Sequence, residues 1–215
     1  LGGLGEVGRN MCLIEYKNDI IVIDVGFGFP EEDMPGIDYV LPNPSYLDGK
    51  QNRIRAIILT HGHMDHVNGI RDLQKTHDIP VYISKHEAEF YTPPCNHLHK
   101  VNNGQVLKIG NLSFECIHTP GHSPGCQCFR HGDVLISGDT VFIDGCGRCD
   151  LPGSDVEAMY NSLYHVVMKL PDSTVLYPGH NYSDEPVSTI GQEKRWNPYL
   201  QTKDLKDFLT FRKGG

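Results

Sequence analysis

Three histidines and one aspartate fall within six residues, in the segment His61-Gly62-His63-Met64-Asp65-His66. The apolar run at residues 55–60 has the length and β-branching of a buried strand, and residues 67–78 have the spacing of a helix. A strand before the segment and a helix after it would confine the four polar side chains to a small volume. Neutral imidazole and carboxylate are ligands of Zn²⁺, Fe²⁺ and Mn²⁺. We therefore predict that this segment binds metal.

Further candidate ligands follow other expected strands, each close to glycine. His122 lies on the proline- and glycine-rich segment 119–125, Asp139 follows a strand expected at 133–137, and His180 follows one expected at 174–177. Asp24 closes a strand expected at residues 20–25. We expect it either to accept the outer N–H of a metal-bound histidine, which would orient that ring, or to cap its own turn. Each position is weak evidence alone, but the repeated pattern favours one shared site.

The elements that must position these residues alternate between strands and helices, which predicts an α/β fold. The 215 residues are expected to form a single domain, residues 1–215, because no low-complexity linker divides them. Turn residues predict three hairpins: 11–16 with 20–25, 106–109 with 112–118, and 126–130 with 133–137. Further helices are expected at 85–91, 154–169 and 201–213, and an irregular loop at 27–50.

Charge and composition limit the partners. The formal net charge of −8 argues against a surface that follows nucleic-acid phosphates. No apolar run is long enough to span a membrane, and we expect no signal-like leader before Leu1. The seven cysteines are best read as reduced thiols. We therefore expect a cytoplasmic protein with a small-molecule substrate and neither nucleic-acid nor membrane partners, while the oligomeric state stays open.

Taken together, these motifs resemble those of the metallo-β-lactamase superfamily along nearly all of the chain. That resemblance implies a four-layer αββα sandwich in which strand ends converge on one or two metal ions. Matched position by position, His61, His63 and His122 would hold the first ion. Asp65, His66 and His180 would hold the second, and Asp139 would bridge the two. The implied cofactors are two divalent ions, with zinc first and iron or manganese as alternatives.

The resemblance to individual families changes along the chain. Residues 1–70 resemble the start of ribonuclease J, through Leu1-Gly2-Gly3-Leu4-Gly5-Glu6-Val7-Gly8, residues 29–38 and the metal segment. From about residue 110 the chain is similar to glyoxalase II and persulfide dioxygenase, through Gly145-Cys146-Gly147-Arg148 and Tyr177-Pro178-Gly179-His180. Ribonuclease J inserts a large RNA-clamping domain between the bridging aspartate and the last histidine. Only 41 positions separate Asp139 from His180 here, which leaves no room for that domain.

These likenesses favour a binuclear, glyoxalase II-like hydrolase that attacks a small acyl-thioester, ester or amide with a metal-bound hydroxide. Asp65 is the predicted catalytic residue, since it would hold the second ion and orient the hydroxide. Arg148 matches a cationic position that contacts glutathione in glyoxalase II, although Asp150 replaces that family's aromatic residue. The first alternative is a mononuclear iron persulfide dioxygenase, which would use positions matching His61, His122 and Asp139. The second is a ribonuclease or phosphodiesterase of the ribonuclease J type.

Overall fold

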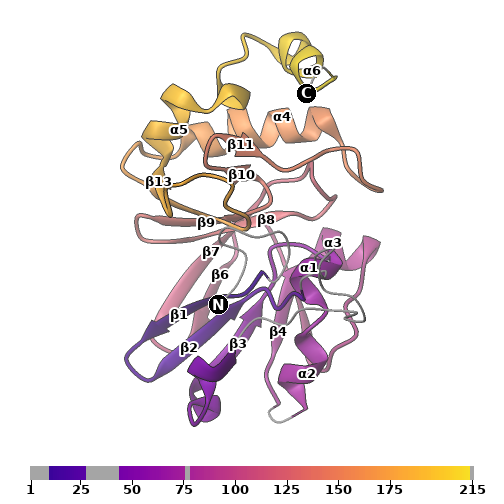
Figure 1. The fold of residues 1–215 in the computed structure, drawn as a ribbon. Helices are drawn as coiled ribbons and strands as arrows, with labels where there is room; N and C mark the ends of the chain where they lie inside the picture. Colours follow the sequence, from indigo (N-terminus) through magenta and orange to yellow (C-terminus); the bar gives the residue numbers. More distant parts are fainter. Residues whose placement is uncertain (1–9, 28–43, 76–77, 214–215) are drawn as a thin grey trace, which may run out of the picture.

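The computed structural model describes residues 10–27, 44–75 and 78–213. Within them the chain forms two β-sheets, a small hairpin and helices on both outer sides (Figure 1). The expected loop at 27–50 lies mostly outside the described residues. Its last part forms the 3₁₀ helix η1 (Pro44–Leu47). The predicted α/β class is confirmed.

The first sheet comes from the N-terminal half of the chain. Its strands run in the order β1 (Cys12–Tyr16), β2 (Asp19–Ile23), β3 (Ile54–Ile58), β4 (Val81–Ser84) and β5 (Leu98–Val101). Strands β1 and β2 form the predicted antiparallel hairpin, and β2 to β5 pair in parallel. The 3₁₀ helix η2 (Gln51–Arg53) leads into β3. Parallel pairing brings the carboxyl ends of β2 and β3 to one edge of the sheet, where the metal segment begins.

The second sheet comes from the C-terminal half and faces the first. Its order is β13 (Ser188–Thr189), β12 (Val175–Pro178), β9 (Val134–Gly138), β8 (Gln127–His131), β7 (Leu112–His118) and β6 (Val106–Ile109). The hairpins of β6 with β7 and of β8 with β9 are those predicted from their turn residues. Strands β10 (Val141–Phe142) and β11 (Gly145–Cys146) form the separate hairpin just after Asp139.

Helices complete the outer layers of the molecule. The helices beside the first sheet are α1 (Met64–Val67), α2 (Ile70–Gln74) and α3 (Lys85–Phe90). Those beside the second are α4 (Val156–His165), α5 (Ile190–Trp196) and α6 (Leu205–Lys213), with the 3₁₀ turns η3 (Val167–Lys169) and η4 (Pro198–Leu200) (Figure 1). No helix of the described residues has the length and apolar character needed to cross a membrane.

Three separate hydrophobic clusters show why the layers stack in this order. In β2, Ile20 and Val22 pack with α1 to α3, whereas Ile21 and Ile23 point to the opposite face and pack against the second sheet. A third cluster joins the outer face of the second sheet to α4, α5 and α6. Alternate side chains of a strand point to opposite faces, so a strand buried on both sides reads as a continuous apolar run. The predicted αββα sandwich is confirmed by these three interfaces.

The helix expected at 67–78 is wrong in its limits. Helix α1 begins earlier, at Met64, so Asp65 and His66 lie in a helical turn rather than in a loop. The helical run breaks at Gly69, whose N–H donates to the carbonyl of Val25 at 2.7 Å, and α2 ends at Gln74. A Cβ at position 69 would lie 2.7 Å from Cγ1 of Val25, so only glycine allows this approach. Strand β5 and helix α5 were not predicted.

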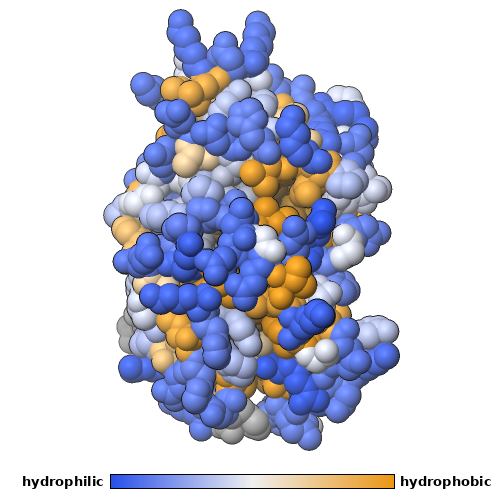
Figure 2. All heavy atoms as spheres, turned by 180° about the vertical axis from the view of Figure 1, so that it is seen from behind, coloured by the Kyte–Doolittle hydropathy of each residue, from blue (hydrophilic) through white to orange (hydrophobic). Residues whose placement is uncertain are grey.

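The surface is mostly polar. On the face opposite to that of Figure 1, hydrophilic atoms dominate, and the exposed hydrophobic atoms gather in a band near the middle (Figure 2). The large apolar side chains that fill the layers are fully buried, among them Ile57, Phe114 and Phe129. The chain therefore has the buried core that its apolar content predicts.

Candidate metal centre

The structure brings the seven predicted ligand residues to one place between the sheets. His61 and His63 follow β3, while Asp65 and His66 lie on α1. The other three residues follow strands or loops of the second sheet: His122 after β7, Asp139 after β9 and His180 after β12. Residues from four segments of the sequence thus meet at the edge where the two sheets face each other.

The first group of ligands is a set of three imidazoles. One ring nitrogen from each of His61, His63 and His122 lies within 4.8 Å of the others. The Nδ1 of His63 is 2.9 Å from the Nε2 of His122, and their rings are nearly perpendicular. Three imidazole nitrogens that converge in this way are a donor set for a transition metal or zinc. We refer to these three residues as the first triad.

A second group contains one carboxylate and two imidazoles, Asp65, His66 and His180, again with donor atoms within 4.8 Å of one another. The Nε2 of His180 lies 3.3 Å from Oδ2 of Asp65. Asp139 stands between this second triad and the first. Its Oδ2 is 3.3 Å from Nε2 of His180 and 3.5 Å from Nε2 of His122, and its Oδ1 is 3.4 Å from Nε2 of His66. One carboxylate therefore reaches both triads.

Unsatisfied polar atoms indicate that this cluster suits a metal. The Nε2 of His61 and the Oδ1 of Asp139 are buried and have no hydrogen-bond partner among the described residues. Such groups are costly to bury, and a metal ion is one way to satisfy them. Imidazole with carboxylate suits zinc, iron and manganese. The residues fit one ion in each triad, with Asp139 shared between them.

The pKa values of the site histidines differ between the two triads, being raised for His66 and His180 and lowered for His63. Burial lowers the pKa of His66, but the carboxylates of Asp139 and Asp24 outweigh it and raise the pKa to about 9. Burial likewise lowers the pKa of His180, and its bonds to Asp139 and Asp65 raise it to about 10. In the first triad, burial and the neighbouring His122 lower the pKa of His63 to about 4. The two histidines of the metal-free second triad are therefore protonated at neutral pH.

Zinc binding is accordingly expected to release protons. A histidine must be neutral to bind a metal, so protons compete with zinc at every pH below the pKa of His66, about 9, and that of His180, about 10. Apparent affinity for the second ion should rise with pH up to that range. Calorimetric titration at pH 7.5 in two buffers of different ionisation enthalpy measures the released protons. Equal heats in the two buffers would contradict this expectation, and His180→Ala should release fewer protons.

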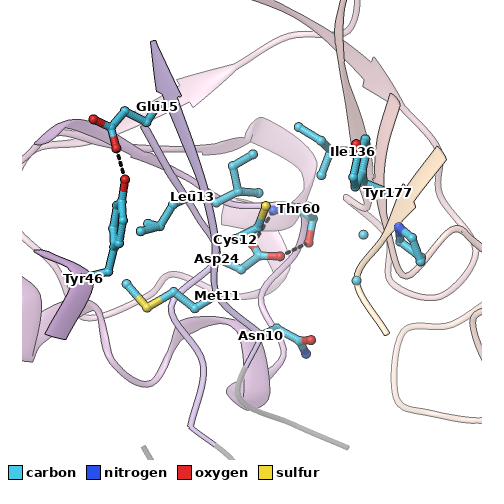
Figure 3. A pocket seen from close by; sticks show the side chains of 14 residues that line it. Asn10, Met11, Cys12, Leu13, Glu15, Asp24, Tyr46, Thr60, Ile136 and Tyr177 are labelled. Atoms are coloured by element: carbon cyan, nitrogen blue, oxygen red, sulfur yellow. Dashed lines mark hydrogen bonds between the residues drawn. The ribbon is translucent and has the colours of Figure 1, made fainter. Parts of the chain in front are cut away.

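The structure places Asp24 where it can orient two ligands. Its Oδ2 is 2.8 Å from Nδ1 of His66, on the side of the ring away from the second triad. The same carboxylate accepts hydrogen bonds from the backbone N–H and the hydroxyl of Thr60, at 2.8 and 2.7 Å (Figure 3). The Thr60 hydroxyl lies in turn 3.1 Å from Nδ1 of His61. Contacts of this kind fix the ring orientation of a ligand histidine.

Asn10 is a residue of the site that the sequence did not indicate. Its buried side-chain nitrogen lies 2.8 Å from Nε2 of His66, 3.1 Å from Nε2 of His180 and 3.3 Å from Oδ2 of Asp65. The amide therefore contacts all three members of the second triad. An asparagine just before a strand is common, and no spacing rule relates Asn10 to His180, which is 170 positions away.

A cleft of about 580 Å³ opens from the metal centre to the surface. Its floor includes His63, Asp65 and Asp139, and its walls are largely apolar or aromatic: Phe142, Ile143, Leu151, Tyr182 and Tyr199. Arg148, the predicted substrate-binding residue, lines the same cleft. Its guanidinium forms two parallel hydrogen bonds to Asp150, at 2.7 and 2.6 Å, so an anionic substrate would have to compete with that carboxylate.

Comparisons with known proteins place the chain in a family. The sequence profile described as metallo-beta-lactamase superfamily matches residues 4–180. Among curated relatives, a "Probable polyketide biosynthesis zinc-dependent hydrolase PksB" of Bacillus subtilis is 32% identical over 84% of each chain. A ribonuclease J 1 of Streptococcus pyogenes is 50% identical, but the match spans 66% of this chain and only 28% of the relative.

Solved structures agree with this placement. ETHE1 from Myxococcus xanthus superimposes with a TM-score of 0.77 at 26% identity, covering 97% of this chain and 87% of that chain. TTHA1623 in a di-iron-bound form gives a TM-score of 0.70 at 30% identity, covering 93% and 98%. The chain therefore belongs to the metallo-beta-lactamase superfamily and is a metal-dependent hydrolase of that group.

Proposed function

We propose that this protein hydrolyses a small acyl-thioester, or a related ester or amide, with two divalent metal ions, zinc in the first instance. The observation that carries the proposal is the meeting of both triads and Asp139 at the floor of one apolar-walled cleft. An enzyme that used a single ion would need only part of this set. The relative PksB, described as zinc-dependent and as a hydrolase, supports the choice of metal and reaction.

Two ions held there would acidify a shared water towards a pKa of about 7 and polarise the acyl carbonyl. The residues themselves supply position and shape. Asp139 lies between the triads and fixes their separation. Asp65 is the more exposed of the two carboxylates, with 22% of its side chain accessible against 7% for Asp139, so it faces the substrate side. The aromatic walls exclude water from the acyl group and bind it by apolar contact.

Persulfide oxidation is the second candidate, and the likeness to ETHE1 favours it. It would require His61, His122 and Asp139, which lie together at the junction of the triads. Two imidazoles and one carboxylate suit a single Fe²⁺ with open positions. Under this proposal Asp65, His66 and His180 would be dispensable for the metal.

Ribonuclease activity is the third candidate, favoured by the 50% identity to ribonuclease J 1. The chain matches only 28% of that relative, and its net charge of −8 gives RNA little electrostatic attraction. We expect weak, salt-sensitive binding of single-stranded RNA at most. Degradation of RNA at physiological salt that is lost in His63→Ala would favour this candidate over the first.

One experiment separates the candidates. The zinc-loaded and iron-loaded proteins are assayed anaerobically with S-D-lactoylglutathione and simpler thioesters, and in air with glutathione persulfide. The proposal predicts thioester cleavage without oxygen, restored by zinc after chelation, with a rate that rises with pH and then levels. Oxygen uptake with the persulfide, without thioester cleavage, would establish the dioxygenase instead.

The Arg148–Asp150 pair leads to a prediction about substrate charge. Asp150→Ala should free the Arg148 guanidinium from its two hydrogen bonds and lower the KM for an anionic thioester by a few-fold. The kcat should stay the same, because both side chains are exposed and neither contacts the triads. A neutral thioester of similar size serves as the control, and its KM should not change. An equal change in KM for both substrates would show that Arg148 does not bind the anionic substrate selectively.

A further inference from the structure

Glu87, on α3, is a buried carboxylate that belongs to neither triad and does not line the cleft. Glu87 is only 1% exposed, and no lysine, arginine or histidine of the described chain forms an ion pair with it. The charge is held instead by three hydrogen-bond donors. Oε1 accepts from the backbone N–H of Gly62 at 2.8 Å, and Oε2 accepts from the Ser123 hydroxyl at 2.7 Å and the Gly125 N–H at 2.8 Å. A buried carboxylate with three donors and no cation calls for an explanation.

The donors belong to the two loops that carry the first triad. Gly62 stands between His61 and His63, and Ser123 follows His122 directly. A single carboxylate thus holds both loops, which come from different sheets. The glycines permit the approach: a Cβ at position 62 would lie 3.0 Å from Oε1 of Glu87, and a Cβ at position 125 would lie 2.0 Å from its backbone nitrogen. The loops are therefore closed onto α3.

The second triad is held by other groups. His66 is oriented by Asp24, and Asn10 reaches His66, His180 and Asp65. None of the hydrogen bonds of Glu87 in the described chain involves these residues. Given the two-ion centre proposed above, we infer that Glu87 is a positioning residue for the first metal site, acting on all three of its ligands and leaving the second site unaffected.

The carboxylate is needed because all three of its partners donate. In Glu87→Gln the side chain keeps its shape, but one end becomes an NH₂ group that donates and cannot accept. The Ser123 hydroxyl can rotate, whereas at least one of the two backbone N–H groups would face another donor and lose its acceptor. One of the two loops would then be released from α3. We expect the first site to bind zinc about 10- to 100-fold more weakly, as for other groups that orient metal ligands.

The test measures each site separately. His180→Ala removes a ligand of the second triad and leaves the first triad complete, and His63→Ala does the reverse. Zinc affinity is measured in both backgrounds by competition with a chromophoric chelator, with and without Glu87→Gln. The inference predicts weaker binding in the His180→Ala background and unchanged binding in the His63→Ala background. The d–d absorption of Co²⁺ in the His180→Ala background should change as well, which reports ligand geometry directly.

Glu193→Gln is the matched control. Glu193 on α5 is also buried, at 2% exposure, and also accepts three bonds, from Ser188, the N–H of Asp144 and Asn197. Both substitutions should lower the thermal stability of the metal-free protein, but only Glu87→Gln should alter zinc affinity and the Co²⁺ spectrum. Equal loss at both sites, equal effects of the two variants, or no effect of Glu87→Gln would overturn the inference. If neither His180→Ala nor His63→Ala binds zinc while Glu87 is still present, the two-ion centre is overturned, and the inference about Glu87 is overturned with it.

Discussion

Replacing Asp139 with asparagine is expected to lower metal content and turnover together, and to remove more metal than any other single conservative change at this centre. The carboxylate lies 3.5 Å from His122 of the first triad and 3.3 Å from His180 of the second, so both ions would share its charge. Burial raises its pKa, but the charge of His66 and the bond from His180 hold that pKa well below the usual range. It is therefore ionised at every pH of interest. Asparagine keeps the shape and removes this charge.

We expect Asp139→Asn to lose most of both ions at equilibrium and to lower kcat about 10²- to 10³-fold, the usual cost of removing one preorganised charge. Elemental analysis after dialysis and steady-state kinetics measure the two effects. Asp144→Asn is the control, because Asp144 is an exposed carboxylate lining the same cleft. It should keep its full metal content. A fully loaded, fully active Asp139→Asn variant would show that Asp139 is not shared between the sites.

The sequence predicts the parts of this molecule that repeat a simple pattern. Buried strands read as apolar runs because both of their faces are covered, as Ile20 to Ile23 of β2 show. Ligand types next to glycine at strand ends mark the site, since strand ends of facing sheets meet at one edge. Asp24 could be singled out for the same reason, as a carboxylate that closes a strand. In each case the evidence is local to a few residues.

Features that depend on tertiary contact could not be read in this way. Helix α1 ends, and the run breaks at Gly69, because that backbone meets Val25, which is 44 positions earlier. Glu87 lies in a short helix whose sequence resembles any amphipathic surface helix, and its partners are 25 to 38 positions away. Asn10 has its partners 55 to 170 positions away. Buried polar residues with distant partners leave no periodic signal.

Asp65→Asn is expected to remove the second ion without removing the first. The Oδ2 of Asp65 is 3.3 Å from Nε2 of His180 and 3.7 Å from Nε2 of His66. Asp65 is not a member of the first triad. Burial raises the pKa of Asp65, and the hydrogen bond from His180 and the charge of His66 lower it further than burial raises it. The variant should therefore lose the second ion and keep the first. Its kcat should fall about 10²- to 10⁴-fold, because the residue that faces the substrate and orients the attacking group is neutralised.

The result also decides between one ion and two, because the mononuclear candidate does not use Asp65. Metal content is measured alongside kcat and KM for the best thioester, and oxygen uptake with persulfide is measured on the same iron-loaded sample. A binuclear hydrolase predicts that Asp65→Asn retains one ion and loses turnover with little change in KM. A dioxygenase that needs only His61, His122 and Asp139 predicts full iron content and full oxygen uptake in the same variant. Since Asp139→Asn should disable either enzyme, the contrast between these two aspartates identifies which reaction the centre performs.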